Sequence, residues 1–130
     1  MTNDELVRQM SPGESRPFDL EERTARFGEE VIDFVLSVRR NAVTSPIIGQ
    51  LVRSATSIGA NYCEADDAGS RKEFKYRIGL CRRESRETKF HLRMIVRAAK
   101  ERVESARPLW KEAHELNLIF ATIYRNTRDE

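Results

Sequence analysis

The sequence predicts an all-α protein, an antiparallel up-down-up-down four-helix bundle with left-handed packing. Apolar residues recur at steps of three and four along four successive segments, which is the spacing of one helix face. The prolines and glycines lie mostly between these segments, and no alternating run of β-branched residues indicates a strand. The 130 residues suffice for one domain. We place the bundle at residues 19–128, preceded by a flexible tail over residues 1–18.

The first expected helix begins after Asp19, a good N-cap, and has carboxylates at Glu21 and Glu22, where the helix dipole favours them. Its inward row is Leu20, Thr24, Phe27, Val31, Phe34 and Val38. The second expected helix has Ser45 as N-cap and Pro46 as its first residue, and it ends near Asp66. Its inward row is Ile48, Leu51, Ala55, Ile58 and Tyr62.

The third expected helix opens with a capping box, in which Ser70 and Glu73 satisfy each other's backbone amides. It runs for about thirty residues, or about 45 Å. Its inward row is Phe74, Ile78, Cys81, Ser85, Thr88, Leu92, Ile95 and Ala99. The fourth expected helix follows Ser105 and Pro108, with the row Leu109, Ala113, Leu116, Phe120 and Ile123. Burial of these four rows is expected to stabilise the fold, because exposed charged faces contribute little.

The charge is nearly balanced over the whole chain but not along it. The 23 basic and 21 acidic residues give a net charge of +2, which excludes a histone-like polycation or a disordered polyelectrolyte. Residues 71–102, however, carry 12 basic residues against four acidic ones, a net of +8, while residues 1–70 have a net of −5. Basic residues repeated along one helix are typical of a surface that binds nucleic-acid phosphates. The candidates are Lys75, Arg82, Arg83, Arg86, Lys89, Arg93 and Arg97.

A second interpretation of the same charges stays open. The basic third helix can equally pair with acidic neighbours on the first helix or on another subunit. The sequence has no recognition-helix turn, zinc finger or base-stacking sheet motif. Any bound RNA or DNA is therefore expected to be recognised through its backbone and shape.

No catalytic or metal site is expected. A di-iron bundle needs Glu-x-x-His pairs, but Thr88 stands three residues before His91 and Lys111 three before His114. Two cysteines cannot form a four-ligand zinc site, and Cys81 fits a buried thiol in the inward row. Because phosphate-binding loops and nucleophile motifs are also missing, we predict a protein without enzymatic activity or cofactor.

Arg53, Ser57, Asn61 and Glu64 form a polar strip beside the inward row of the second helix, and Glu84, Ser85, Glu87 and Thr88 interrupt the third helix at mid-length. In an antiparallel hairpin that closes near residue 68, Arg53 lies at the height of Glu84 and Glu87. We predict a buried interhelical pair between Arg53 and a carboxylate that fixes the register of the two helices. The alternative is that this strip lines a pore or pocket.

Further apolar residues lie outside the inward rows and suggest a partner surface, with identical subunits as the simplest partner. They are Tyr76, Leu80, Phe90 and Met94 on the third helix and Trp110 and Tyr124 on the fourth. No stretch approaches the ~20 apolar residues of a membrane helix. Asp4, Glu5 and Arg8 interrupt any signal peptide. A cytoplasmic location without a membrane partner is expected.

Three segments of the chain together resemble a known family. They are Leu51–Ala65 (LVRSATSIGANYCEA); Ser70–Phe74 with Glu84–Thr88 and Leu92; and Leu109–Leu116 (LWKEAHEL) with Ile119 and Phe120. They resemble the four-helix-bundle proteins first known from open reading frames in intervening sequences of 23S ribosomal RNA genes. The resemblance spans about residues 20–128.

The resemblance implies an up-down bundle that assembles into a homopentameric ring and has no established enzymatic activity. It also implies similarity to the accessory variability protein of diversity-generating retroelements, a basic pentameric barrel that binds nucleic acid. The expected function is thus a non-enzymatic ring that binds RNA or DNA backbone through the third helix. The alternative is a structural or protein-interaction module whose basic and acidic faces pair between subunits.

Overall fold

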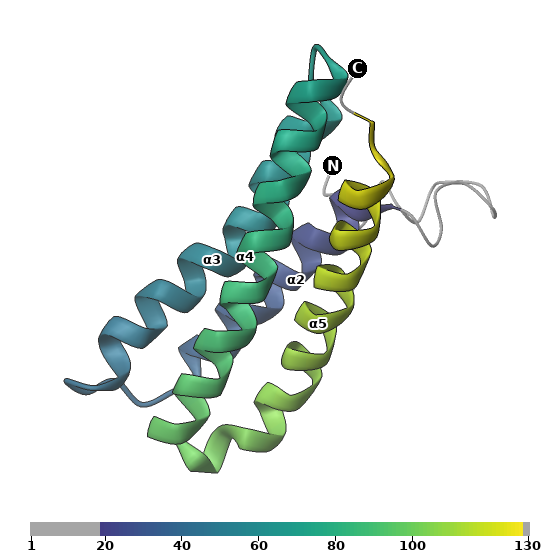
Figure 1. Ribbon diagram of the computed structural model, residues 1–130. Coiled ribbons are helices and arrows are strands. Elements are labelled where there is room, and N and C mark those ends of the chain that lie inside the picture. Colours follow the sequence, from purple (N-terminus) through teal and green to yellow (C-terminus); the bar gives the residue numbers. More distant parts are fainter. Residues whose placement is uncertain (1–18, 129–130) are drawn as a thin grey trace, which may run out of the picture.

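A computed structural model describes residues 19–128 of the protein, and the flexible tail expected over residues 1–18 lies outside them. The described part contains four long helices, one 3₁₀ turn and no strand, as the sequence predicts. The elements are α2 (Leu20–Leu36), α3 (Thr44–Asp66), α4 (Arg71–Ala98), η1 (Lys100–Arg102) and α5 (Val103–Asn126). The α3–α4 turn lies at one end, and the other two connections lie at the opposite end, so the bundle is antiparallel and up-down-up-down (Figure 1).

The helices are packed unequally. The contacts of α4 with α3 and α5, and of α2 with α3, are extensive, whereas α2 and α5 touch at few points. At that edge Arg23 binds Glu112 with both ends of its guanidinium group, Nε–Oε2 at 2.7 Å and Nη2–Oε1 at 2.8 Å. A two-point contact of this kind has a defined geometry, so it fixes the position of α2 beside α5.

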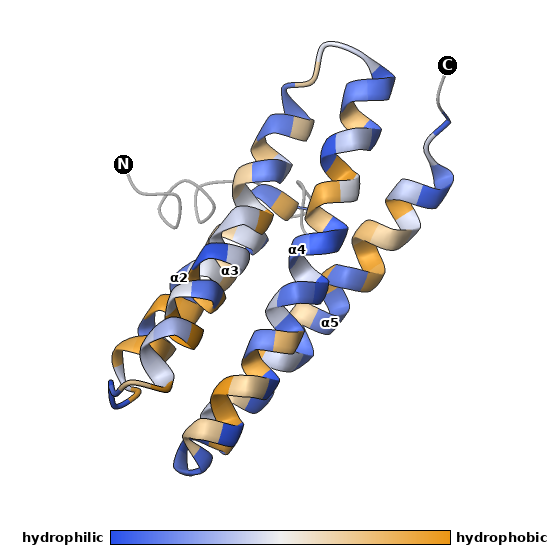
Figure 2. Cartoon of the chain, turned by 60° about the vertical axis from the view of Figure 1, so that its left-hand side comes forward, coloured by the Kyte–Doolittle hydropathy of each residue, from blue (hydrophilic) through white to orange (hydrophobic). Residues whose placement is uncertain are grey.

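The core consists largely of the predicted inward rows, to which the structure adds Val35, Ala65 and Ala106. Of their members, only Tyr62, Phe74 and Ile123 stay half-buried. All three lie toward the end where the α3–α4 hairpin extends beyond α2 and α5 (Figure 1). Hydrophobic and hydrophilic residues alternate in short stretches along the helices (Figure 2), as one buried face per helix requires. Among the described residues no helix is both long and apolar enough to cross a membrane.

Close approach of α2 to α3 depends on Gly59. A Cβ atom at this position would lie 3.1 Å from Thr24 Oγ1, nearer than ordinary van der Waals contact. The hydroxyl of Thr24 is itself held by the Leu20 carbonyl at 2.6 Å. A larger residue than glycine would therefore push the two helices apart.

The starts of the helices differ in part from the prediction. Asp19 caps α2 as expected, since its side chain accepts from the Glu22 amide at 3.2 Å. The predicted start of α3 at Pro46 is wrong, because the helix begins at Thr44. Asn41 takes the capping role instead, and its Oδ1 accepts from the amides of Val43 and Thr44 at 2.9 Å each. Pro46 then lies in the first turn, where no backbone N–H is needed.

The start of α4 is confirmed apart from one hydrogen bond, whereas that of α5 needs correction. Ser70 caps α4 and accepts from the Glu73 amide, but Glu73 returns its bond to the amide of Gly69 rather than to that of Ser70. The predicted start of the last helix after Pro108 is also wrong, because α5 begins at Val103 and includes Pro108. The proline only removes the bond to the Glu104 carbonyl, one turn from the helix start, and its side chain is exposed there.

Truncation of Leu116 to alanine should lower the free energy of unfolding by about 2–5 kcal/mol, because this fully buried side chain would leave a cavity in the core. Lys111→Ala on the exposed side of the same helix is the control and should change it by less than about 0.5 kcal/mol. Urea unfolding followed by circular dichroism measures both. Equal stability of the two variants would contradict the placement of Leu116 in the core.

Candidate nucleic-acid interface

The charged residues of α4 are outside the bundle because its inward row takes up one narrow face. Small residues such as Cys81, Ser85 and Thr88 occupy the middle of this row and are completely buried. All the arginines fall on the remaining surface of the helix. Those among the predicted candidates that are exposed are Arg82, Arg83, Arg86, Arg93 and Arg97.

None of these five arginines has an ion pair within residues 19–128. The ion pairs between helices in this part of the chain involve Arg23 and Arg53 instead. The acidic outer side of α2 is likewise exposed, and Glu29, Glu30 and Asp33 have no ion pair in the same region. The basic and acidic surfaces therefore do not neutralise each other within the described part of one chain.

The structure places Lys75 and Arg82 against α5. The Lys75 Nζ lies 4.7 Å, and the Arg82 guanidinium carbon 5.6 Å, from the centre of the Tyr124 ring. Both are distances at which a cation is attracted to the face of an aromatic ring. The ring reaches this position because Gly79 has no side chain, since a Cβ atom there would lie 3.1 Å from Tyr124 Cε2.

Lys89 is also directed toward α5. Its Nζ lies 5.2 Å from the centre of the Trp110 ring and 3.1 Å from Nδ1 of His114. A lysine ammonium group can only donate, so Nδ1 of His114 must accept this bond. The rings of Trp110 and His114 are stacked at 5.2 Å. Lys75, Arg82 and Lys89 thus form a side of the basic surface that contains aromatic rings.

Two hollows lie on either side of the exposed face of α4 that carries Arg83 and Arg86, and these two arginines line both hollows. The α3-side hollow, with a volume of about 610 Å³, is lined by Gln50, Arg53, Arg83, Arg86, Glu87, Phe90 and His91. The α5-side hollow, of about 240 Å³, is lined by Gly79, Arg82, Arg83, Arg86 and Tyr124. Burial lowers the pKa of His91; Glu87 opposes this effect and Arg53 adds to it. The positive charge of the α3-side hollow therefore comes from its arginines.

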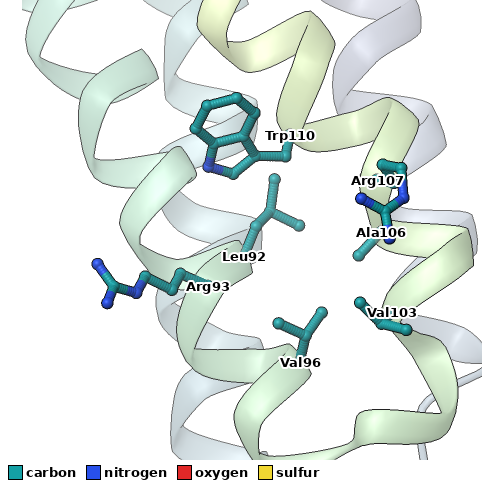
Figure 3. A pocket seen from close by; sticks show the side chains of 7 residues that line it. All are labelled: Leu92, Arg93, Val96, Val103, Ala106, Arg107 and Trp110. Carbon is teal, nitrogen blue, oxygen red and sulfur yellow. The ribbon is translucent and has the colours of Figure 1, made fainter.

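A third hollow, with a volume of about 240 Å³, lies between the end of α4 and the start of α5. Leu92, Val96, Val103, Ala106 and Trp110 form its apolar lining, together with the stems of Arg93 and Arg107. Figure 3 shows the guanidinium group of Arg93 pointing away from this space. The charge of Arg93 is thus available on the outer surface.

Arg53 pairs with the two carboxylates predicted for it. Its Nη1 lies 3.2 Å from Glu84 Oε2, and its Nη2 lies 2.8 Å from Glu87 Oε2. The hydrogen bonds to Glu87 and to Glu84 raise the pKa of Arg53. The expectation that this pair is buried is wrong, because 47% of the Arg53 side chain is exposed. Exposed ion pairs of this kind contribute about 0–1 kcal/mol to the free energy of unfolding. The pair therefore matters mainly because it joins α3 to α4 at one defined register.

The uncharged polar contacts between helices involve two residues that the sequence interpretation missed. Ser54 is fully buried, and its Oγ lies 2.9 Å from Oγ1 of Thr88 on α4. Asn117 on α5 donates to the Arg82 carbonyl at 2.9 Å and to Ser85 Oγ at 3.2 Å. The signal for Ser54 was its place three residues after Leu51 and four before Ile58, on the inward face of α3.

The other members of the predicted polar strip do not converge on one site. Asn61 donates to the Ser57 carbonyl at 2.9 Å and accepts from Arg77 at 3.4 Å, while Glu64 is exposed. Arg53 and Glu87 line the α3-side hollow, whereas Ser57, Asn61, Glu64 and Thr88 line none of the three hollows described above. Within residues 19–128, no group of three or more histidine, cysteine, aspartate and glutamate side chains is arranged to hold a metal ion.

Comparison with known proteins assigns this bundle to a family. The 23S rRNA-intervening sequence protein family matches residues 18–122, which is most of the chain. The chain belongs to this family. The family membership agrees with the resemblance carried by the sequence segments in α3, α4 and α5.

A solved structure shares the fold of this family member. It is the crystal structure of a protein of unknown function from the S23 ribosomal protein family of Bacteroides thetaiotaomicron. That protein is 25% identical, with a TM-score of 0.72, and the match covers 82% of this chain and 98% of the other. No curated protein matches the chain.

The two cysteines of this family member should differ sharply in reactivity. Burial raises the pKa of both thiols, that of Cys81 to about 12; the Cys81 Sγ is buried 3.5 Å from the Ile58 carbonyl, whereas Cys63 is exposed. Only the thiolate reacts readily, so a raised pKa slows alkylation at every pH below it. Iodoacetamide at pH 8 should modify Cys63 in the native protein and Cys81 only after unfolding, as mass spectrometry of the peptides would show. Equal rates at both cysteines in the native protein would contradict this assignment.

Proposed function

We propose that this protein is a non-enzymatic bundle that assembles into a homopentameric ring and binds the phosphate backbone of nucleic acid through α4. The observation that carries the proposal is the set of exposed arginines on α4 without ion pairs in the described chain: Arg82, Arg83, Arg86, Arg93 and Arg97. The core does not need these side chains, which leaves their charge for a polyanion. Release of counterions from the nucleic acid would then drive binding.

The ring is supported by two different apolar faces on the outside of the bundle. Ile32 and Leu36 are 39% and 79% exposed on α2, and Trp110 and Leu118 are 41% and 53% exposed on α5. A ring requires that one surface of each subunit meets a different surface of the next subunit. The α2 face and the α5 face are two different surfaces of the bundle and provide such a pair.

A second function is favoured by the acidic side of α2. Glu29, Glu30 and Asp33 are exposed and have no ion pair in the described residues, so they can accept arginines of a neighbouring subunit. In that arrangement the charges of α4 are used within the assembly, and the protein is a structural or interaction module. Such an assembly would weaken at high salt, because exposed charges more than about 8–10 Å apart are screened at physiological ionic strength.

Replacement of Arg83, Arg86 and Arg93 by glutamine should weaken nucleic-acid binding. Each lost phosphate contact should reduce the slope of log K against log salt by about 0.7 to 0.9. Fluorescence anisotropy with labelled RNA and DNA over a series of salt concentrations measures this slope. The matched control replaces Arg39, Arg40 and Arg125, which are exposed elsewhere and remove the same charge. Equal effects of the two triple variants would contradict a binding role for α4.

The ring predicts a particle with five times the 15.1 kDa mass of one chain. Multi-angle light scattering at low and high salt measures this mass directly. Leu36→Asp should lower the mass toward that of the monomer, because it places a charge in an apolar contact. The control Arg40→Asp lies nearby on the exposed α2–α3 connection and should leave the mass unchanged. A wild-type monomer at all salt concentrations would contradict the ring.

A further inference from the structure

The α3-side and α5-side hollows beside α4 each have an aromatic ring in their lining together with Arg83 and Arg86. Arg83 and Arg86 line both hollows. Phe90 lies in the α3-side hollow with 56% of its surface exposed, and Tyr124 lies in the α5-side hollow. A ligand that fits both features must combine negative charge with flat apolar surfaces.

We infer that these hollows bind single-stranded nucleic acid, with phosphates on Arg83 and Arg86 and unpaired bases against Phe90 and Tyr124. The inference rests on the proposed binding of nucleic-acid backbone to α4. It adds the class of ligand, a single strand rather than a duplex, and the residues that make the distinction. A basic groove with aromatic rings on which bases stack is the usual solution for binding single strands without sequence preference.

The α3-side hollow fits a base beside a phosphate. The Phe90 ring contacts His91 edge to face, with the ring centres 5.6 Å apart and an angle of 71° between the planes. This contact favours a defined orientation of the exposed ring. The one carboxylate in the hollow, that of Glu87, is bound to Arg53 at 2.8 Å. Arg83 and Arg86 have no such partner in the described chain, so a phosphate can approach them.

The α5-side hollow supplies the second ring. Lys75 and Arg82 lie near the Tyr124 ring at 4.7 Å and 5.6 Å, so cations surround it. Gly79 keeps this hollow open, because any side chain there would press against Tyr124. Arginine groups near an aromatic ring can also stack on a base.

Two other ligands fit these hollows less well. In a duplex the bases are stacked on one another and show only their edges in the grooves, so Phe90 would face sugar and phosphate. A second copy of this chain could pair the carboxylates of its α2 with Arg83 and Arg86, but the exposed side chains of α2 include no flat ring to set against Phe90 and Tyr124. A single strand supplies both the negative charge and the apolar faces.

The test compares four labelled ligands of equal length by fluorescence anisotropy: oligothymidylate, oligouridylate, an abasic strand and a DNA duplex. The full-length protein is compared with Phe90→Leu, which removes the aromatic ring but keeps an apolar side chain, and with the control Phe90→Tyr, which keeps a ring. Circular dichroism and light scattering are recorded for each variant. We expect Phe90→Leu to bind both base-containing strands at least about fivefold more weakly, the lower limit for loss of one stacked base.

Further results support the inference if the abasic strand binds wild type and Phe90→Leu equally, and if Phe90→Tyr binds like the wild type. One result would overturn stacking and leave the proposed function intact. In it, Phe90→Leu and Tyr124→Leu bind base-containing strands as the wild type does, whereas replacement of Arg83 and Arg86 by glutamine abolishes binding. Absence of salt-dependent binding to all four ligands would overturn both. A fall in particle mass for Phe90→Leu would show that this face is a subunit contact and would also overturn the inference.

Discussion

Burial of one narrow row of side chains on α4 is the constraint on which the rest of the structure depends. This helix lies between α3 and α5 and packs extensively against both. Its row has small residues in the middle, Cys81, Ser85 and Thr88, all with no exposed surface. Small side chains let neighbouring helices approach closely, and the charged residues of α4 lie on the part of its surface that these neighbours do not cover. The long basic surface is the direct result of this narrow contact.

The polar contacts inside the bundle keep these helices in register. The pair Ser54–Thr88 joins α3 to α4, and Asn117 joins α5 to α4 through Ser85 and the Arg82 carbonyl. A shift of one helix along another would break these contacts between helices, although Thr88, Ser54 and Ser85 would keep their bonds to carbonyls of their own helices. The positions of Arg83 and Arg86 relative to Phe90 and Tyr124 are thereby fixed by the core.

The fold could be predicted from the sequence because its signal is repeated in every helix. The steps of three and four in the inward rows identified nearly all the core residues, and the antiparallel hairpin placed Arg53 opposite Glu84 and Glu87. Helix starts were less predictable, because Asn41 and Ser45 are both good caps and only the folded chain selects between them. The shared hollows could not be predicted, since they join residues of α4 to Gln50, Arg53 and Tyr124 from other helices. Such placement depends on the angle between helices and not on spacing along one of them.

The sparse contact between α2 and α5 has a consequence for how the bundle opens. On its α5 side, α2 is held mainly by the half-exposed contacts of Arg23 with Glu112 and Glu115. Regions with few buried contacts separate from a fold at lower free energy than its core does. The α2–α5 edge is therefore expected to open more readily than the interfaces of α4 with α3 and α5, while the buried row of α2 stays packed on α3. Neither arginine-lined hollow contains a residue of α2. The basic surface can thus stay in place while the contacts of α2 with α5 are open. The binding surface therefore does not depend on every part of the bundle being closed.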